Sequence, residues 1–498
     1  MALEKYDLCI IGGGPSGYAA AMRAIDFGKK VLLVEKDRVG GAGLYNGALS
    51  SKAMWEFSTR YSEIRKELHD LSDKEISISY AEVSKYVEAA LFERKFQLAC
   101  HIKLLQTETA SKLFTYERGW AKLKSKNEIV IRKGNNSEKE VYADNIILAT
   151  GSRPRKAENI NIDEKFILTS DGIHAISDFP KSLVILGAGV IGCEFATIFS
   201  NFGKTRVHLI DKADRILPFE DADLSAFVAN NLEKNGAVVH KNASLVRMEI
   251  KDDEVEYELK YKNEKTEVIR VEKALISIGR VPNIENLGIE NAGVTLNERG
   301  CIIETDTRTV VPTIYAVGDV TSNIALVNVG ELEGRCAVEK IFENPDKKLI
   351  YNNLSTIMFL NPEVAAVGMN EQQVLAQKLN YRAVKMDYSC IARAIAMRKT
   401  KGFIKIIVTD DNEMKILGMR VVGEHASSAV QAVALLISMN KGIAELADLI
   451  HPHPSIIEGI QECVRMLLGK SIFKSSVFKD KLKCYRCVDG VCIPMERL

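Results

Sequence analysis

The sequence predicts an α/β protein in which two similar three-layer domains precede a C-terminal α+β domain. Three observations lead to this prediction. The chain has 498 residues, which suggests about three domains. A unit of strand, glycine-rich turn, helix and strand begins near residue 6 and recurs near residue 182. From about residue 350 the pattern changes to alternating strands and helices, for example the strand at residues 403–408.

Composition narrows the functional classes. The net charge is +1, from 67 Lys+Arg and 66 Asp+Glu, which argues against general electrostatic binding to nucleic acid or to a membrane. No apolar run approaches the roughly 18 residues of a membrane span, and residues 1–14 enter a strand too early for a signal peptide. Ten cysteines in so long a chain do not make a disulfide scaffold. We therefore expect a cytoplasmic protein with mostly free thiols and no bound metal.

The first glycine-rich unit predicts a Rossmann-like nucleotide-binding domain. A β-rich apolar run at residues 6–11 leads into a turn with glycine at positions 12, 14 and 17. In such a turn Gly12 permits the tight bend, Gly14 lets the backbone approach a pyrophosphate, and Gly17 lets helix and strand pack closely. The helix N-terminus then stabilises the phosphate charge, and Glu35, after the second strand, can bind ribose hydroxyls.

The second unit repeats this arrangement with Gly187, Gly189, Gly192 and Asp211. Glycines in a single motif can serve only to shape a turn, but two complete units favour two dinucleotide sites. A carboxylate at Asp211 favours the 2′-hydroxyl of NAD over the 2′-phosphate of NADP. Lys204 and Lys212 lie nearby in the sequence and weaken this preference.

Further motifs show a family resemblance. Together with the glycine turns, three segments occur in the order and approximate spacing of the pyridine nucleotide–disulfide oxidoreductases: residues 119–121 (GWA), 149–151 (ATG) and 313–319 (TIYAVGD). Residues 5 to about 470 resemble this family, and most of all its dihydrolipoamide dehydrogenases. The resemblance implies that the first unit binds FAD and the second binds NAD. It assigns FAD to Gly12, Gly14, Gly17, Glu35, Lys36, Gly41, Lys52, Ala121, Thr150, Gly151 and Asp319, and NAD to Gly187, Gly189, Gly192, Asp211 and Gly279.

The resemblance also predicts the domain organisation. Residues 1–152 and 281–350 would form a discontinuous FAD-binding domain, and residues 153–280 the NAD-binding domain. Residues 351–470 would form the α+β dimerisation domain, and residues 471–498 a lysine-rich tail with three cysteines.

Two side-chain pairs carry the chemistry that the resemblance implies. Lys52 and Glu194 match a lysine–glutamate pair near flavin N5, although without the resemblance we would read them as ordinary surface and helix residues. His453 matches the general acid/base, and Glu458 matches the carboxylate that orients it. In the family this histidine acts in the partner subunit's site, which implies a homodimer. The alternative is a proline-stiffened loop with incidental histidines.

One departure from the family changes the expected chemistry. The family places a reactive disulfide in a GG-x-C-x4-C-I-P-S-K segment, whereas this chain has Gly43 and Ala48 at the cysteine positions, Tyr45 at the usual asparagine and Ser50 at the proline. Electrons therefore cannot pass between a dithiol and FAD at this place. Hydride transfer between NADH and flavin needs no cysteine.

The tail offers substitute thiols. Cys484, Cys487 and Cys492 form a C-x2-C-x4-C pattern, and C-x2-C is a spacing used by redox and metal sites. We consider three possibilities: Cys484 and Cys487 as a catalytic redox pair, a zinc site that recruits a distant fourth ligand, and a flexible tail with incidental thiols.

These observations predict an FAD-dependent NAD(H) oxidoreductase that uses either the tail thiols or a small diffusible molecule as acceptor. One alternative is a flavoprotein like the soluble pyridine nucleotide transhydrogenases, although Asp211 disfavours NADP. Another is a non-catalytic FAD-binding subunit of a dehydrogenase complex, although the retained Lys52, Glu194, His453 and Glu458 argue against it.

Overall fold

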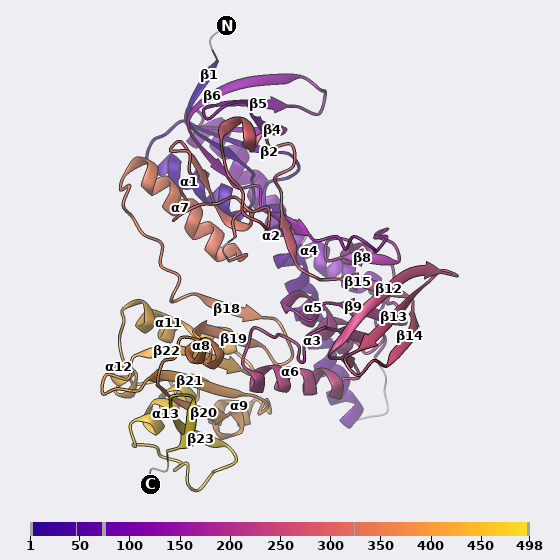
Figure 1. Ribbon diagram of the computed structural model, residues 1–498, viewed down its shortest axis with the longest axis vertical. Coiled ribbons are helices and arrows are strands. Elements are labelled where there is room, and N and C mark those ends of the chain that lie inside the picture. Colours follow the sequence, from indigo (N-terminus) through magenta and orange to yellow (C-terminus); the bar gives the residue numbers. More distant parts are fainter. Residues whose placement is uncertain (1–2, 46, 72–75, 323, 496–498) are drawn as a thin grey trace. The chain divides into compact units, whose positions relative to one another are not determined.

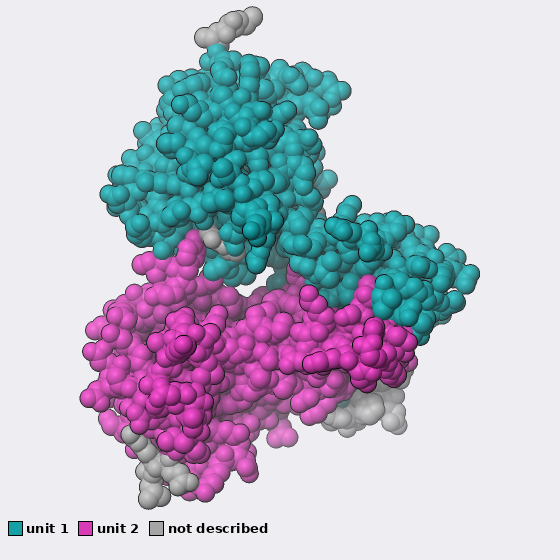
Figure 2. All heavy atoms as spheres, in the orientation of Figure 1, with its two compact units in different colours: residues 1–187, 246–258, 268–349 teal, residues 188–245, 259–267, 350–498 magenta. Residues whose placement is uncertain are grey.

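The computed structural model describes residues 3–45, 47–71, 76–322 and 324–495. The chain divides into two compact units, which are coloured separately in Figure 2. Unit 1 comprises residues 1–187, 246–258 and 268–349, and unit 2 comprises residues 188–245, 259–267 and 350–498. The division into FAD-binding, NAD-binding and dimerisation domains at the boundaries given above stays a prediction.

Unit 1 contains a seven-stranded sheet (Figure 1). Its order is β3-β2-β1-β6-β5-β4, and β17 also pairs with β6. The strands β1, β2, β3, β6 and β17 pair in parallel, and β4 and β5 extend the sheet antiparallel from β6. Every residue of β2 is buried, as expected for a parallel strand covered on both faces. The strands span Glu4–Ile11 (β1), Val31–Glu35 (β2), Phe114–Arg118 (β3), Trp120–Leu123 (β4), Glu128–Arg132 (β5), Glu138–Leu148 (β6) and Ile314–Ala316 (β17).

Helices α1 and α7 lie side by side in unit 1 and share a core with the sheet (Figure 1). They approach closely because Gly334 of α7 has no side chain, and a Cβ there would overlap the Ser16 carbonyl of α1. The sequence suggests that residues 56–110 are helical, and the later part of α3, with α4 and η1, lies in this range on either side of residues 72–79. A capping box of Ser79 and Glu82 starts α4. The helices span Pro15–Asp26 (α1), Gly41–Leu44 (α2), Ala48–Leu71 (α3), Tyr80–Leu104 (α4), Leu105–Thr109 (η1), Ile289–Ala292 (η3), Gly318–Val320 (η4) and Val327–Phe342 (α7).

The second glycine-rich unit is built from short parallel strands and one buried helix. In unit 1, β15 pairs in parallel with both β8 and β9, and in unit 2, β10 pairs in parallel with β11. The strands β12, β13 and β14, whose residues are divided between the two units, form a three-stranded sheet. The bounds are Ser152–Pro154 (β7), Ile167–Thr169 (β8), Ile173–Ala175 (η2), Ser182–Leu186 (β9), Val190–Phe202 (α5), Arg206–Ile210 (β10), Ala222–Lys234 (α6), Val238–His240 (β11), Ala243–Lys251 (β12), Glu254–Tyr261 (β13), Thr266–Val271 (β14), Lys273–Ile276 (β15) and Arg280–Pro282 (β16).

Unit 2 contains a second seven-stranded sheet, of order β18-β19-β22-β21-β20-β23-β24, in which all neighbours are antiparallel. Residues of α11 and α13 pack with one face of this sheet in a large apolar core. The strands span Ser355–Met358 (β18), Val364–Gly368 (β19), Tyr381–Asp387 (β20), Phe403–Thr409 (β21), Ile416–Val422 (β22), Leu482–Val488 (β23) and Val491–Pro494 (β24). The helices span Glu371–Ala376 (α8), Tyr388–Cys390 (η5), Ala392–Ala396 (α9), Ala426–Ala429 (α10), Gln431–Ser438 (α11), Ala444–Ala447 (α12) and Glu458–Leu467 (α13).

A buried ionic cluster ties α6 to this sheet. The Lys405 side chain on β21 is 1% exposed, and its Nζ lies 2.9 Å from Asp221, 3.0 Å from Asp223 and 2.5 Å from Glu371. Burial lowers the pKa of Lys405, but the three carboxylates outweigh burial and raise it above its ordinary value. The cluster therefore keeps a charged lysine inside unit 2.

Residues 482–494 are part of the fold, which corrects the alternative of a flexible tail with incidental thiols. Strand β23 pairs along its length with β20, and β24 closes a hairpin against β23. Residues 482–494 thus extend the sheet formed by residues 355–422. Within the described residues, no helix has both the length and the apolar character needed to cross a membrane.

Candidate functional site: two glycine cradles

The first glycine turn in unit 1 has the geometry that the sequence predicts. Gly12 has a φ of +108°, and a Cβ there would overlap the Ala149 carbonyl oxygen. A Cβ at Gly17 would overlap the Gly12 carbonyl, so these two glycines permit the bend and the close packing of helix on strand. Gly14 caps α1, and nothing lies within 4 Å of the place where its Cβ would be. The open space therefore lies at the helix N-terminus, where a phosphate group would bind.

Glu35 closes the other side of this cradle. Its carboxylate accepts hydrogen bonds from the Gly13 N–H at 2.7 Å and from the Asp37 N–H at 2.8 Å, and it is 9% exposed. The Gly119 N–H donates to the Glu35 carbonyl at 3.0 Å, which brings the GWA segment beside the end of β2. Two further residues that the resemblance assigns to FAD lie in or beside the GWA segment. Ala121 is buried in β4, and Lys36 Nζ lies 4.8 Å from the centre of the Trp120 ring.

The second cradle repeats these contacts. In unit 2 the Asp211 carboxylate accepts the Ala188 N–H at 2.8 Å and the Ala213 N–H at 2.9 Å, as Glu35 accepts Gly13 and Asp37. Gly189 caps α5 with open space at its Cβ position, and Gly192 is buried within α5. Gly187 has a φ of +101°, close to that of Gly12. The internal repeat expected from the sequence is thus present at the level of individual hydrogen bonds.

Gly187 and Gly279 lie on the unit 1 side of the second glycine-rich unit. A Cβ on Gly187 would meet the Ser277 carbonyl, which parallels the contact of Gly12 with Ala149. Gly279 has a φ of +110°, a conformation that glycine adopts without strain. Their role in binding NAD stays a prediction.

Asp319 lies among polar partners in unit 1. The Ser152 hydroxyl donates to Asp319 Oδ2 at 2.7 Å, and Arg280 Nε donates to the same hydroxyl at 2.7 Å. The η4 turn that carries Asp319 is held by the buried Glu333, which accepts the Gly318 N–H at 2.6 Å. The arrangement presents a carboxylate at a fixed place, as a contact to a cofactor chain requires.

Asn283 makes three hydrogen bonds with the turn that follows β6. Thr150 Oγ1 donates to the Asn283 carbonyl at 2.7 Å, and the Asn283 side-chain amide donates to the Thr150 carbonyl at 2.9 Å. The Asn283 N–H donates to the Gly151 carbonyl at 2.9 Å. Asn283 is therefore a supporting residue for the ATG motif that the sequence did not reveal.

The segment at which the resemblance places the family disulfide contains the short helix α2 and the start of the long helix α3. Gly41 starts α2 with a φ of +48°, and Ala48 starts α3. A Cβ on Gly43 would lie 2.7 Å from Pro15 Cγ, so a larger residue there would require Pro15 to shift. Asn46, within the motif quoted above, lies outside the described residues. The sequence has no cysteine between residues 10 and 99.

A partly buried histidine lies beside this segment. His174 Nε2 is 3.1 Å from the Ser50 hydroxyl, and burial lowers the pKa of His174 to about 4. The imidazole is thus neutral near pH 7 and shares a hydrogen bond with the Ser50 hydroxyl. Sequence reasoning missed His174 because it lies 124 residues from Ser50 and belongs to no motif.

Lys52 and Glu194 lie in different units, so their pairing stays a prediction. Lys52 is on α3, and its Nζ lies 3.3 Å from Ser51 Oγ. Glu194 is on α5, 5% exposed, and accepts the Phe359 N–H at 3.1 Å.

His453 and Glu458 form the predicted dyad in unit 2. His453 Nδ1 lies 2.8 Å from Glu458 Oε1, and the Ser455 N–H donates to Glu458 Oε2 at 2.8 Å. Burial raises the pKa of Glu458, but the bonds from Ser455 and His453 outweigh it and hold that pKa below its ordinary value. The carboxylate therefore orients the imidazole and leaves Nε2 directed away from the pair on a side chain that is 71% exposed.

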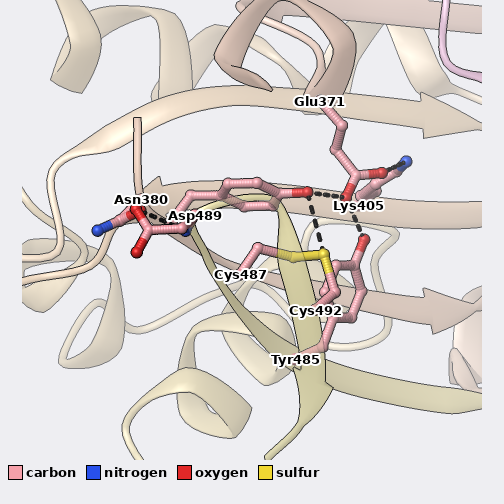
Figure 3. Close-up of a disulfide and its surroundings, with 8 residues drawn as sticks. Glu371, Asn380, Lys405, Tyr485, Cys487, Asp489 and Cys492 are labelled. Carbon is pink, nitrogen blue, oxygen red and sulfur yellow. Dashed lines mark hydrogen bonds and ion pairs between the residues drawn. A yellow bond between two sulfur atoms is a disulfide. The ribbon is translucent and has the colours of Figure 1, made fainter. Parts of the chain in front are cut away.

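The predicted redox pair of Cys484 and Cys487 is wrong as a pairing. Cys487 forms a disulfide with Cys492, its partner across the β23–β24 hairpin (Figure 3). Cys484 is buried in the apolar core on one face of the sheet, whereas Cys487 belongs to the smaller cluster with Val374 and Tyr381. The reason is the period of a β-strand, since residues three apart point to opposite faces.

Comparison with known proteins identifies the family. Residues 6–334 match the pyridine nucleotide-disulphide oxidoreductase family, and residues 354–464 match its dimerisation domain. Dihydrolipoyl dehydrogenase of Geobacillus stearothermophilus is 32% identical over 475 residues, which cover 95% of this chain and 98% of that protein. One from Bacillus subtilis is 31% identical over 471 residues, covering 94% and 97% respectively.

Solved structures show the same fold. The crystal structure of LpdA from Mycobacterium tuberculosis has a TM-score of 0.84 and 25% identity, and the match covers 93% of this chain and all of that one. The flavoprotein disulfide reductase RclA from Escherichia coli has a TM-score of 0.80 at 22% identity over the same share of this chain. The resemblance drawn from the motifs is confirmed: this chain belongs to the pyridine nucleotide-disulphide oxidoreductases, and it is an FAD- and NAD(H)-dependent oxidoreductase like dihydrolipoyl dehydrogenase.

Proposed function

We propose that this protein oxidises NADH through FAD and delivers the electrons to a diffusible acceptor instead of a disulfide beside the flavin. The observation that carries the proposal is the combination of two complete cradles with Gly43 and Ala48 in place of the family's reactive cysteines. The cradles retain what cofactor binding requires, whereas the segment that would carry the dithiol holds no sulfur.

The residues present fit FAD in the first cradle. Open space at the Gly14 Cβ position lets a pyrophosphate reach the N-terminus of α1. Glu35 offers carboxylate oxygens to ribose hydroxyls, and Asp319 offers one to the chain between the phosphate and the ring. When bound there, FAD supplies a two-electron carrier between NADH and the acceptor.

The second cradle supports NAD as the preferred nucleotide. Asp211 is already oriented by two backbone N–H groups, so its carboxylate is fixed where a 2′-phosphate would meet negative charge. A transhydrogenase would have to accept NADPH at this same place.

His453 supplies a proton in this proposal. Glu458 holds the Nδ1 side of the ring, so Nε2 can give a proton to an acceptor that has taken up electrons. As in the family, the residue would act in the partner's site of a homodimer, and the dimerisation domain at residues 354–464 supports this arrangement. The retained dyad also argues against an inert binding subunit.

An anaerobic reductive titration of the purified holoprotein tests the proposal. We expect an uptake of two electrons per FAD, because no cysteine pair communicates with the flavin. An uptake of four electrons would contradict the proposal. The variant Cys487→Ser/Cys492→Ser would then show whether the hairpin disulfide is the second acceptor, since its loss would return the count to two.

Two further measurements separate the alternatives. Reduction of the flavin by NADPH as fast as by NADH would favour a transhydrogenase. Failure of NADH to reduce the flavin at all would favour a non-catalytic subunit. The proposal requires fast reduction by NADH and much slower reduction by NADPH.

A further inference from the structure

A basic segment joins α13 to β23 at the margin of unit 2, drawn as a yellow loop in Figure 1. Residues 470–483 contain five lysines and one aspartate, so the segment carries a net charge of +4 in a chain whose total is +1. The segment lies beyond the family's matched dimerisation domain, which ends at residue 464. The near-neutral total charge therefore hides a local concentration of positive charge.

The same segment exposes large apolar side chains. Ile472 is 68% exposed and Val477 is 70% exposed, and both exceed what a well-packed loop leaves to solvent. Phe473 and Phe478 are 36% and 43% exposed, and their rings contact each other edge to face at 6.2 Å between centroids. Four apolar side chains thus lie among lysines within one short stretch.

The segment is attached to unit 2 at both ends. The Ser471 hydroxyl and the Ile472 N–H both donate to the buried Glu462 on α13, at 2.6 and 2.9 Å. At the other end, Leu482 is buried and the Asp387 N–H donates to the Lys481 carbonyl at 2.9 Å. The exposed side chains are therefore presented by an anchored loop.

We propose that residues 470–483 form a docking surface for an anionic lipid bilayer. The four apolar side chains would enter the boundary between headgroups and acyl chains, and the lysines would contact lipid phosphates. Charge complementarity and composition support a bilayer over a protein partner, because protein interfaces are depleted in lysine. The expectation of no membrane partner came from total charge, which does not describe this loop. The proposal does not depend on the identity of the electron acceptor.

Co-sedimentation of the holoprotein with vesicles tests the proposal. Vesicles of equal parts phosphatidylcholine and phosphatidylglycerol are compared with vesicles of phosphatidylcholine alone. We expect binding to the anionic vesicles, little binding to the neutral ones, and weaker binding as salt increases. Absence of binding to the anionic vesicles would overturn the proposal.

Substitutions in the loop locate the surface. The variant Lys474→Gln/Lys479→Gln should weaken binding about 25-fold, since each lysine near an anionic surface contributes about fivefold. Ile472→Ser/Phe478→Ser should also abolish stable binding. Both pairs are exposed, so the fold should be unaffected. Binding that neither variant weakens would overturn the proposal.

Matched controls and the oligomeric state complete the test. Val310→Ser and Lys156→Gln replace an exposed apolar and an exposed basic residue in unit 1, and both should leave vesicle binding unchanged. The loop variants should keep the oligomeric mass of the wild type. If they instead change that mass, the loop faces a second copy of the chain. If the loop binds a protein and no vesicle, it is a protein interface. Either result overturns the proposal.

Discussion

Replacing Gly14 by alanine separates the folding of the first glycine turn from its capacity to hold a dinucleotide. Gly14 has φ and ψ of −69° and −176°, a conformation that any residue adopts. No atom lies within 4 Å of its Cβ position, so the added methyl group meets nothing in the chain. The neighbouring Gly12, by contrast, would place a Cβ on the Ala149 carbonyl.

These contacts give the expected magnitudes. Without a clash or a forbidden φ, Gly14→Ala should lower the free energy of unfolding of the flavin-free protein by no more than about 1 kcal/mol, since alanine is a poorer N-cap than glycine. The methyl group would occupy the space through which a pyrophosphate approaches the helix N-terminus. Losing one hydrogen bond to a charged group costs about 1.5–3 kcal/mol, so FAD should bind about 10- to 150-fold more weakly.

Two measurements check this prediction. Titration of the flavin-free protein with FAD gives the dissociation constant, and denaturant unfolding of the same sample gives the stability. Gly134→Ala is the matched control, since its Cβ position is equally open but lies in an exposed turn between β5 and β6. The reasoning is refuted if Gly14→Ala binds FAD as tightly as the control, or if it lowers the unfolding free energy by several kcal/mol.

Three other experiments test particular contacts in the structure. Lys405→Met leaves three carboxylates clustered around an uncharged side chain and should lower the unfolding free energy in denaturant by about 3–5 kcal/mol. Because the pKa of Glu458 is lowered, the Glu458 carboxylate stays negative at and above the ordinary carboxyl pKa and becomes protonated only as pH falls through the lowered value. Glu458→Gln should therefore slow acceptor reduction about tenfold or more. The variant should also lack the decrease in kcat that the wild type shows at acidic pH when Glu458 is protonated. Alkylation and mass spectrometry of the non-reduced protein should find Cys487 linked to Cys492 and Cys484 as a thiol, and a Cys484–Cys487 link would contradict the strand pairing.

The glycine cradles were predictable because their contacts are local in the chain. Within one strand–turn–helix–strand unit, the strand that ends at Glu35 runs parallel to the strand that ends at Ile11. The number of residues between Ile11 and Glu35 therefore brings the Glu35 carboxylate to the first glycine turn whenever this unit folds. The same logic placed Asp211 beside Ala188.

The C-terminal cysteines were not predictable by the same means. The C-x2-C spacing brings two sulfurs together in a turn, but it separates them in a strand. Residues 482–488 pair with β20, whose residues lie about 100 positions earlier in the chain, so no local pattern places these cysteines in a sheet. The contact of Ser50 with His174 is likewise set by tertiary packing and leaves no local signal.

The first cradle is built without the residues at which the resemblance places the family's reactive cysteines. The contacts described above for this cradle come from backbone groups, glycines and Glu35, and none of them involves residue 43 or 48. The shape of the cradle therefore does not depend on cysteines at these two positions. Dithiol chemistry does depend on them, and this segment contains no sulfur. A cysteine at position 43 would crowd the turn that opens α1, because a Cβ there would lie 2.7 Å from Pro15 Cγ. The turn can thus hold a cofactor without any cysteine in residues 10–99, which is the combination that the proposed diffusible acceptor requires.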